Sequence, residues 1–390
     1  MDDLIARLRA DTPGCARLIH LNNAGAALPA RPVLDAVQAH LALEAEIGPM
    51  EAGERAADRF AALYPLAARL LGAQPDEIAL TDSVTRGWQL ALASLALKPG
   101  ARLLTHRSEW AGNLAGLHRR AAEVGGQVEV IPSNPDGTVS VDALAAMVDD
   151  RVGLIALTWA PANGGLLNDA AGVGAVARAA GIPYLIDAAQ VVGQWPVDVA
   201  ALACDFLACN GRKHLRAPRG TGLLYVGGDI RGRIEPPHVD AWSAPWPDQR
   251  PRADARAFEA TESAAAMRLG LGVAIGQALD LGLDWISARI GRLADRARSG
   301  LAALPGVTVH DIGTIRTGLV SFSVAGIAPH DLRQRLAAEG INLGANGRTY
   351  TPLDLIARDL HDLMRLSPSY YNTEDEIDRA VDAVGRLSRH

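Results

Sequence analysis

Short apolar segments alternate with helical patterns through the first 230 residues, and this alternation constrains the fold more than any other feature of the chain. The strand-like runs lie at residues 78–80, 102–105, 127–131, 153–157, 183–187 and 205–209. Helical patterns separate most of them, at 85–97, 113–124, 141–149 and 169–180. Such alternation predicts an α/β fold in which helices cover both faces of a mainly parallel sheet. A further strand at 222–226 is expected to close this sheet as an antiparallel edge.

The pattern changes toward the C-terminus. A Pro- and Gly-rich stretch at 227–252 is typical of a long loop, and residues 264–304 have a helical pattern throughout. The remaining strands are expected at 307–311, 319–324, 341–343 and 363–367, with helices at 329–339 and 374–387. Near the N-terminus we expect one helix and an extended stretch at 18–21. The C-terminal part is therefore predicted to be a smaller α+β unit.

Composition excludes several classes of function. The 38 basic and 44 acidic residues give a net charge of −6, which disfavours a nucleic-acid partner. The three cysteines form no CxxC pair, which favours a reducing compartment. No signal-peptide core and no apolar run of about 20 residues is present, so we expect a cytoplasmic protein without a membrane partner. The histidines show no ligand spacing, and no metal site is predicted.

Two residues at consecutive strand ends indicate a site. Asp187 ends the strand YLID, and Lys213 follows the next strand in the segment CNGRKHLRAPRGTG. Open α/β sheets bind ligands at the carboxyl ends of their strands. Taken alone, Asp187 could cap a turn and Lys213 could be a surface lysine. Together they are what pyridoxal phosphate requires, because a lysine forms its Schiff base and a carboxylate holds its ring nitrogen protonated.

The other needs of this cofactor also have candidates. Its phosphate would bind at a helix N-terminus, and Ser83, Val84 and Thr85 open a helix after a strand. An ordinary N-cap is the alternative for this segment. Trp110 follows the strand at 102–105 and is a candidate flat partner for the ring, although a single Trp more often serves in packing.

These residues, with the segments LNNAGAALP and SPSYYNTEDEID, resemble the class V aminotransferase group of fold type I pyridoxal phosphate enzymes. This group includes cysteine desulfurases, isopenicillin N epimerase-like proteins and hercynylcysteine sulfoxide lyases. The resemblance implies a mainly parallel seven-stranded sheet and a homodimer with active sites near the subunit interface. It also implies an N-terminal helix (1–20) that packs with the small domain, a large cofactor-binding domain (21–265), connecting helices (266–304) and a small C-terminal domain (305–390).

The resemblance assigns a role to each candidate residue. Lys213 is the catalytic Schiff-base lysine, Asp187 pairs with the ring nitrogen, Gln190 contacts the ring oxygen and Trp110 faces the ring. The phosphate is held by Ser83, Val84 and Thr85 and by Asn210 and Arg212. A contact across the subunit interface is assigned to Thr261 or Ser263, because Glu262 occupies the position of the family's threonine. Asn23, Asn163, Arg348 and Arg365 bind an amino-acid substrate. Arg365 binds its carboxylate, and Asn163 lies near both this carboxylate and the ring oxygen of the cofactor.

The chain departs from the desulfurases in two respects that bear on the reaction. Residues 345–364 contain no cysteine, whereas desulfurases carry a nucleophilic cysteine there. This absence, and Arg212 in place of histidine, favour C–S lyase-type β-elimination. Epimerisation and transamination are the alternatives, and a non-catalytic sensor of the same fold is a further one.

Overall fold

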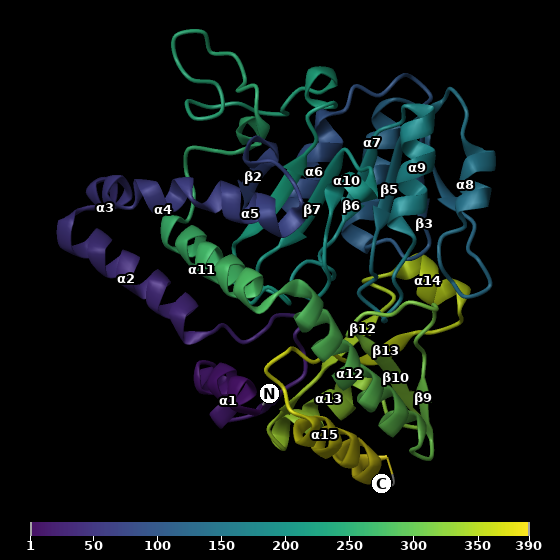
Figure 1. Ribbon diagram of the computed structural model, residues 1–390. Coiled ribbons are helices and arrows are strands. Elements are labelled where there is room, and N and C mark those ends of the chain that lie inside the picture. Colours follow the sequence, from purple (N-terminus) through teal and green to yellow (C-terminus); the bar gives the residue numbers. More distant parts are fainter. Residues whose placement is uncertain (1, 389–390) are drawn as a thin grey trace.

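A seven-stranded sheet forms the centre of the larger part of the molecule in the computed structural model, which describes residues 2–388 (Figure 1). Its order is β2, β8, β7, β6, β5, β3, β4. The strands are β2 (Ile78–Thr81), β3 (Arg102–His106), β4 (Gln127–Ile131), β5 (Val152–Thr158), β6 (Tyr184–Asp187), β7 (Phe206–Asn210) and β8 (Gly222–Val226). All seven predicted strands are therefore present, with ends displaced by one residue at most.

The position of β8 differs from the prediction. The strand is antiparallel, as expected, but it lies inside the sheet, because β2 pairs with its outer side from Ile78↔Tyr225 to Thr81↔Gly222. The chain reverses direction after β7, so that β8 pairs with β7. The other edge of β8 is then left with N–H and C=O groups that need partners. β2 satisfies these groups and becomes the edge strand.

Helices cover both faces of this sheet, as the alternation predicted. They include α6 (Val84–Ser94), α7 (Ala111–Glu123), α8 (Val141–Met147), α9 (Ala170–Ala180) and the short α10 (Val199–Leu202). Alternate residues of β5 point into separate cores: Ile155 and Leu157 into one, Leu154 and Ala156 into the other. A strand that is apolar on both sides needs cover on both sides, which explains its continuous apolar sequence.

The N-terminal segment contains more helix than the sequence analysis identified. After α1 (Asp2–Ala10) and β1 (Ile19–His20) come α2 (Arg31–Ile47), α3 (Pro49–Arg55), α4 (Ala57–Ala61) and α5 (Leu63–Leu71). β1 pairs in parallel with β11 (Ile341–Asn342), so the start of the chain joins the C-terminal part. Short 3-10 turns lie at Pro13–Ala16, Pro75–Glu77, Arg231–Arg233 and Ala255–Phe258.

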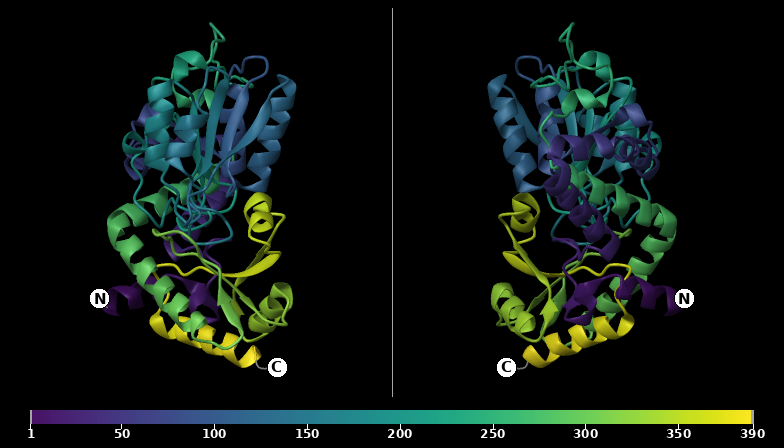
Figure 2. Two further views of the ribbon diagram at one scale, coloured as in Figure 1. Left: turned by 90° about the vertical axis from the view of Figure 1, so that its right-hand side faces the viewer. Right: turned by 90° about the vertical axis from the view of Figure 1, so that its left-hand side faces the viewer.

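Two helices replace the single helical run expected at 264–304. α11 (Ala265–Leu281) and α12 (Leu283–Ala302) meet at an angle of 83°. Gly282 lies between them with a φ of 82°, a left-handed conformation that favours glycine and ends α11. Figures 1 and 2 show both helices running from the large sheet toward the C-terminal part.

The C-terminal part contains a four-stranded antiparallel sheet in the order β12, β13, β10, β9. Its elements are β9 (Val307–Val309), β10 (Val320–Val324), α13 (Pro329–Ala338), β12 (Gly344–Gly347), α14 (Pro352–Ala357), β13 (Asp362–Leu366) and α15 (Glu374–Leu387). Neither β12 nor α14 was predicted from the sequence. The sequence of β12, GANG, lacks strand-forming side chains, and pairing with β13 supplies what its composition does not.

Within residues 2–388, no single helix is long and apolar enough to cross a membrane; α11 and α12 pass such a test only as a bent pair. The same residues contain no group of three or more His, Cys, Asp or Glu side chains placed to hold a metal ion.

Candidate active site

Lys213 lies three residues beyond the end of β7 and is buried. The full chain contains only two lysines, Lys98 and Lys213, and Lys98 is exposed. A long charged side chain is seldom buried without a function. This scarcity of lysine could have singled out Lys213 from the sequence alone. Because Lys98 is exposed, Lys213 has the only buried side-chain amine among the described residues.

Asp187 ends β6, the strand next to β7, in register with Ala208. One carboxylate oxygen, Oδ1, accepts a hydrogen bond of 2.9 Å from the backbone N–H of Ala189. The other, Oδ2, accepts one of 2.8 Å from Nδ2 of Asn113 in α7. Burial raises the pKa of Asp187, while these bonds and the nearby Lys213 amine act against that effect.

A pocket of about 450 Å³ brings most of the predicted residues together. Its predicted lining residues are Val84, Thr85, Trp110, Asp187, Gln190, Asn210, Arg212 and Lys213. Thr158, Ala160, Ala162 and Ala189 complete it, and the sequence analysis did not name these four. Thr158 ends β5, so its strand-end position is the signal that could have identified it.

The phosphate end of the expected site is the N-terminus of α6. Ser83 is the N-cap, and its hydroxyl accepts a hydrogen bond from the Arg86 N–H, so it serves the helix itself. Val84 and Thr85, the first residues of the helix, line the pocket. Arg212 adds a positive charge there, and its guanidinium also donates to the carbonyl oxygen of Gly25.

Trp110 lies at another side of the pocket, and its ring is paired with that of Tyr350. The ring centroids are 5.3 Å apart with the planes tilted by 36°. The N–H of Ala111 also donates to the carbonyl oxygen of Tyr350 over 2.8 Å. The loop after β12 therefore reaches the pocket through Tyr350. Arg348, the residue predicted there, has its Nε bonded to the carbonyl oxygen of Leu360.

Arg365 comes from β13 and connects the C-terminal sheet to the pocket. Its Nη1 donates to the carbonyl oxygen of Ala162 over 2.8 Å, and its Nη2 lies 3.3 Å from Oδ1 of Asn22. Its Nε is buried and has no hydrogen-bond partner. No salt bridge involves Arg365 among the described residues, so the guanidinium is buried without a carboxylate. An anionic ligand would satisfy this charge.

The electrostatics of the site favour a neutral amine. Burial lowers the pKa of Lys213 to about 7, and the charges of Arg212 and Arg365 act in the same direction. Asp187 opposes them. Burial also lowers the pKa of Arg365 to about 10, which leaves this side chain charged at neutral pH. The site therefore combines a fixed cation with an amine that titrates near neutral pH.

Six predicted residues are not part of the lining of this pocket: Ser83, Arg348 and Arg365, described above, and Asn23, Asn163 and Thr261. Asn23 is fully buried, where Oδ1 accepts from the hydroxyl of Tyr371 and Nδ2 donates to the carbonyl oxygen of Ser367. Its neighbour Asn22 is the residue that approaches Arg365.

Asn163 donates to Oδ2 of Asp354 in α14 over 2.8 Å, and its neighbour Ala162 lines the pocket. Thr261 is exposed, and its N–H is bonded to Asp240. It borders a separate cleft that also contains Met50 and Trp242.

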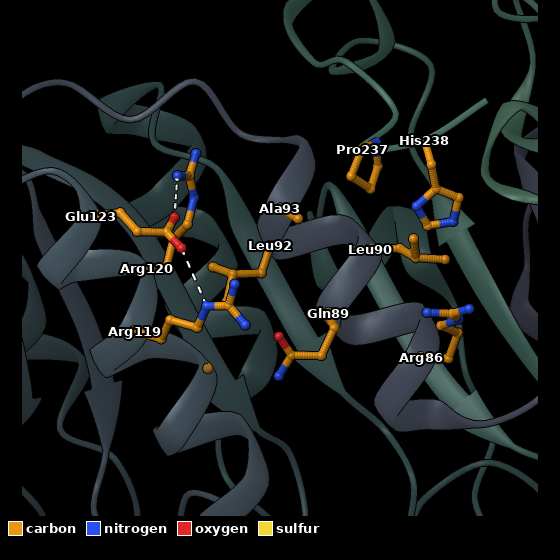
Figure 3. Close-up of a pocket in the computed structure, with 11 residues that line it drawn as sticks. Arg86, Gln89, Leu90, Leu92, Ala93, Arg119, Arg120, Glu123, Pro237 and His238 are labelled. Carbon is orange, nitrogen blue, oxygen red and sulfur yellow. Dashed lines mark hydrogen bonds and ion pairs between the residues drawn. The ribbon is translucent and has the colours of Figure 1, made fainter.

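Another pocket, of about 750 Å³, lies between α6 and α7 and lacks Lys213 (Figure 3). Arg86, Arg119 and Arg120 make its lining basic, and His238 also lines it. Glu123 forms ion pairs with two of these arginines, at 3.3 Å from Arg119 and 2.8 Å from Arg120. This pocket contains none of the residues that the sequence predicted for the site.

The pocket that contains Lys213, called the lysine pocket from here on, has side chains that suit pyridoxal phosphate. Oε1 of Gln190 and both side-chain atoms of Asn210 are buried polar atoms without partners, and both residues line it. Orphaned buried polar groups are costly and indicate a ligand that supplies the missing bonds. The remaining lining offers a single amine, a buried carboxylate on the neighbouring strand, a helix N-terminus and an arginine.

Comparison with known proteins gives the same assignment. Residues 19–380 match the family described as Aminotransferase class-V. A cysteine desulfurase of Salmonella agona is 28% identical over 414 aligned positions, covering 99% of this chain and 98% of that protein. The structure of the Escherichia coli cysteine desulfurase CsdA is similar with a TM-score of 0.89 at 25% identity, covering 98% of both chains. The cystine C-S lyase C-DES, in complex with its product cysteine persulfide, has a TM-score of 0.86 at 26% identity, covering 97% of this chain and 99% of that one.

The fold and the site thus define a pyridoxal-phosphate-dependent enzyme of fold type I that acts on amino acids. Another structure of C-DES, a variant with glycine covalently linked to its pyridoxal phosphate, is 26% identical with a TM-score of 0.87. More narrowly, the chain belongs to the class V aminotransferase family.

Proposed function

We propose that this enzyme catalyses β-elimination at a C–S bond of a cysteine-derived amino acid. In the overall reaction an S-substituted cysteine and water give a thiol, pyruvate and ammonia, so atoms and charge balance without an oxidant or reductant. Pyridoxal phosphate, when bound, withdraws electrons from the substrate Cα. The thiol group leaves from Cβ with the electron pair of the C–S bond.

The residues of the pocket, and Arg365 next to Ala162 of its lining, have the properties that this reaction needs. Arg365 binds the substrate carboxylate, for which its buried and unpaired guanidinium is suited. Lys213 accepts the Cα proton, because an amine with a pKa of about 7 is largely neutral just above neutral pH. Asp187 keeps the ring nitrogen protonated, and Gln190 contacts the ring oxygen. Val84, Thr85, Asn210 and Arg212 hold the phosphate, and Trp110 faces the ring.

The observation that carries the choice of reaction is the position of the cysteines. Cys204 and Cys209 are buried beside or within β7, and burial raises the pKa of both thiols, that of Cys209 to about 12. Cys15 lies before β1, and neither it nor the other two line the lysine pocket. A nucleophilic cysteine needs a lowered pKa and access to the substrate. The similarity to a cystine C-S lyase supports an elimination that uses no such cysteine.

Product analysis tests this proposal. The enzyme is incubated with cysteine, S-conjugates of cysteine, cystine and the sulfoxides of the conjugates, and pyruvate is measured together with the released sulfur compound, which is sulfide, a thiol, a persulfide or a sulfenic acid, respectively. Pyruvate equimolar with that sulfur compound, lost in Lys213→Ala and kept in Lys98→Ala, is the expected result. Conversion of the cofactor to its amine form without pyruvate would indicate transamination instead. Solvent-deuterium exchange at Cα with inversion would indicate epimerisation, and no exchange with any amino acid would indicate a sensor.

We further propose a cytoplasmic homodimer, with the four domains bounded at residues 20, 265 and 304. Thr261 is exposed at a cleft with Met50 and Trp242, which is consistent with a contact from one subunit to the phosphate of the other. Light scattering should give twice the mass of 41.0 kDa, and a monomer would contradict the dimer.

A further inference from the structure

A second buried carboxylate lies behind the pocket, and none of the roles proposed above uses it. Glu109 precedes α7 and is 1% exposed. Its Oε1 accepts hydrogen bonds from the N–H of Trp110 (3.0 Å), from Nδ2 of Asn113 (2.9 Å) and from the hydroxyl of Thr158. Its Oε2 accepts from the hydroxyl of Thr105 in β3 (2.8 Å). Four donors around one carboxylate favour its ionised form, against the effect of burial, which raises its pKa.

Asn113 links this carboxylate to Asp187. Its amide nitrogen carries two hydrogens, and the nitrogen lies 2.9 Å from Glu109 Oε1 and 2.8 Å from Asp187 Oδ2. The two carboxylate oxygens therefore lie within about 6 Å of each other in a buried region, where like charges interact strongly. The Glu109 carboxylate holds the amide nitrogen of Asn113 in place. It therefore also sets the direction from which this nitrogen approaches the Asp187 carboxylate.

The same carboxylate also holds two residues of the pocket wall. The Trp110 N–H lies between Glu109 Oε1 and the hydroxyl of Thr158, which is 3.3 Å from it. Both Trp110 and Thr158 line the lysine pocket. Glu109 thus connects β3, β5 and α7 directly behind the site.

We propose that Glu109 is a positioning residue for the cofactor ring, which orients the Asp187 carboxylate through Asn113 and strengthens its hold on the proton of the ring nitrogen. This inference rests on the proposed function of Asp187. The other titratable groups that interact with Asp187 are Lys213, three residues after the end of β7, and the thiol of Cys209, within β7. The negative charge of Glu109 near Asp187 raises the pKa of the ring nitrogen that pairs with Asp187. Removal of this charge should therefore let the ring nitrogen lose its proton at a lower pH.

The test is ¹⁵N NMR of the holoenzyme reconstituted with pyridoxal phosphate labelled at the ring nitrogen, titrated with pH. In the wild-type enzyme we expect the protonated-nitrogen shift at neutral pH. In Glu109→Gln the midpoint of deprotonation should fall by on the order of one to two pH units, as expected for a like charge at about 6 Å in a medium of intermediate dielectric constant. Asn113→Ala should move it in the same direction and serves as the second variant if Glu109→Gln does not fold.

Glu376→Gln is the matched control. Glu376 is also a buried glutamate, and it accepts from Asn372, four residues away, over 2.8 Å, but it lies in α15. This variant should lower the melting temperature without moving the ¹⁵N midpoint. An unchanged midpoint in both site variants, or an equal shift in the control, would overturn the role of Glu109 while leaving that of Asp187 intact. A ring nitrogen unprotonated in the wild-type enzyme, or no cofactor binding, would overturn both.

Discussion

The ionisation of Lys213 offers the most direct test of the physical argument for the site. Burial, with Arg212 and Arg365 nearby, lowers the pKa of Lys213 from 10.5 to about 7. That difference corresponds to about 5 kcal/mol of free energy against the charged amine. Because the folded state binds its proton less tightly than the unfolded state, Lys213 destabilises the cofactor-free protein most below pH 7, and this penalty fades as the pH rises toward 10.5.

The consequence for reactivity is large. At pH 8, an amine with a pKa of about 7 is about 90% neutral, whereas an ordinary exposed lysine is about 0.4% neutral. The neutral fractions differ by about two hundredfold, and only the neutral amine is a nucleophile.

Competitive acetylation of the cofactor-free protein measures this difference. Trace acetic anhydride is added over a range of pH, and the rate at each lysine is read by peptide mass spectrometry. Since the chain has only two lysines, exposed Lys98 is an internal reference in every sample. Acetylation of Lys213 should have its midpoint near pH 7. Arg212→Gln should raise that midpoint, and Arg219→Gln, which changes an exposed arginine six residues from Lys213, should leave it in place.

If the acetylation of Lys213 and Lys98 follows the same pH dependence in the folded protein, desolvation does not control the amine, and the proposed acceptance of the Cα proton at neutral pH loses its basis.

Three further variants test the other roles. Arg365→Gln should raise the KM for the amino acid by about 10- to 100-fold with the visible absorbance of the cofactor retained, since a charge-assisted bidentate pair is lost; an unchanged KM would place the carboxylate elsewhere. Asp187→Asn should lower kcat by about 100-fold or more while Lys213 still bonds to the cofactor, as borohydride trapping and mass spectrometry would show; near-normal turnover would argue against a role for this carboxylate. Trp110→Ala should weaken cofactor binding by about tenfold in absorbance titrations, and an equal affinity would mean that this ring serves only to pack against Tyr350.

Local patterns determined the elements that carry the site. The apolar runs before Asp187 and Lys213 identified β6 and β7, and the segment from Ser83 to Thr85 identified the start of α6. Local patterns could not predict the order of β2 and β8 in the sheet, because pairing depends on which edge remains free once the other strands have assembled.

Local sequence patterns also could not predict the directions in which individual side chains point. The sequence selected Asn163 and Arg348, but the backbone directs Asn163 to Asp354 and turns Arg348 to the carbonyl oxygen of Leu360. Tyr350 reaches Trp110 only because the loop after β12 folds back over the start of α7. A one-residue difference in position along an extended segment reverses the face on which a side chain lies.

The alternation of strands and helices could therefore be predicted from the sequence, as could the two charged residues at neighbouring strand ends and the family to which they correspond. Each of these follows from short-range periodicity and residue chemistry. The link from Asp187 through Asn113 to Glu109 became visible in the folded molecule alone, since it joins residues 74 and 4 positions apart along the chain. Such contacts arise from packing between β3, β5, β6 and α7, which no local sequence pattern specifies.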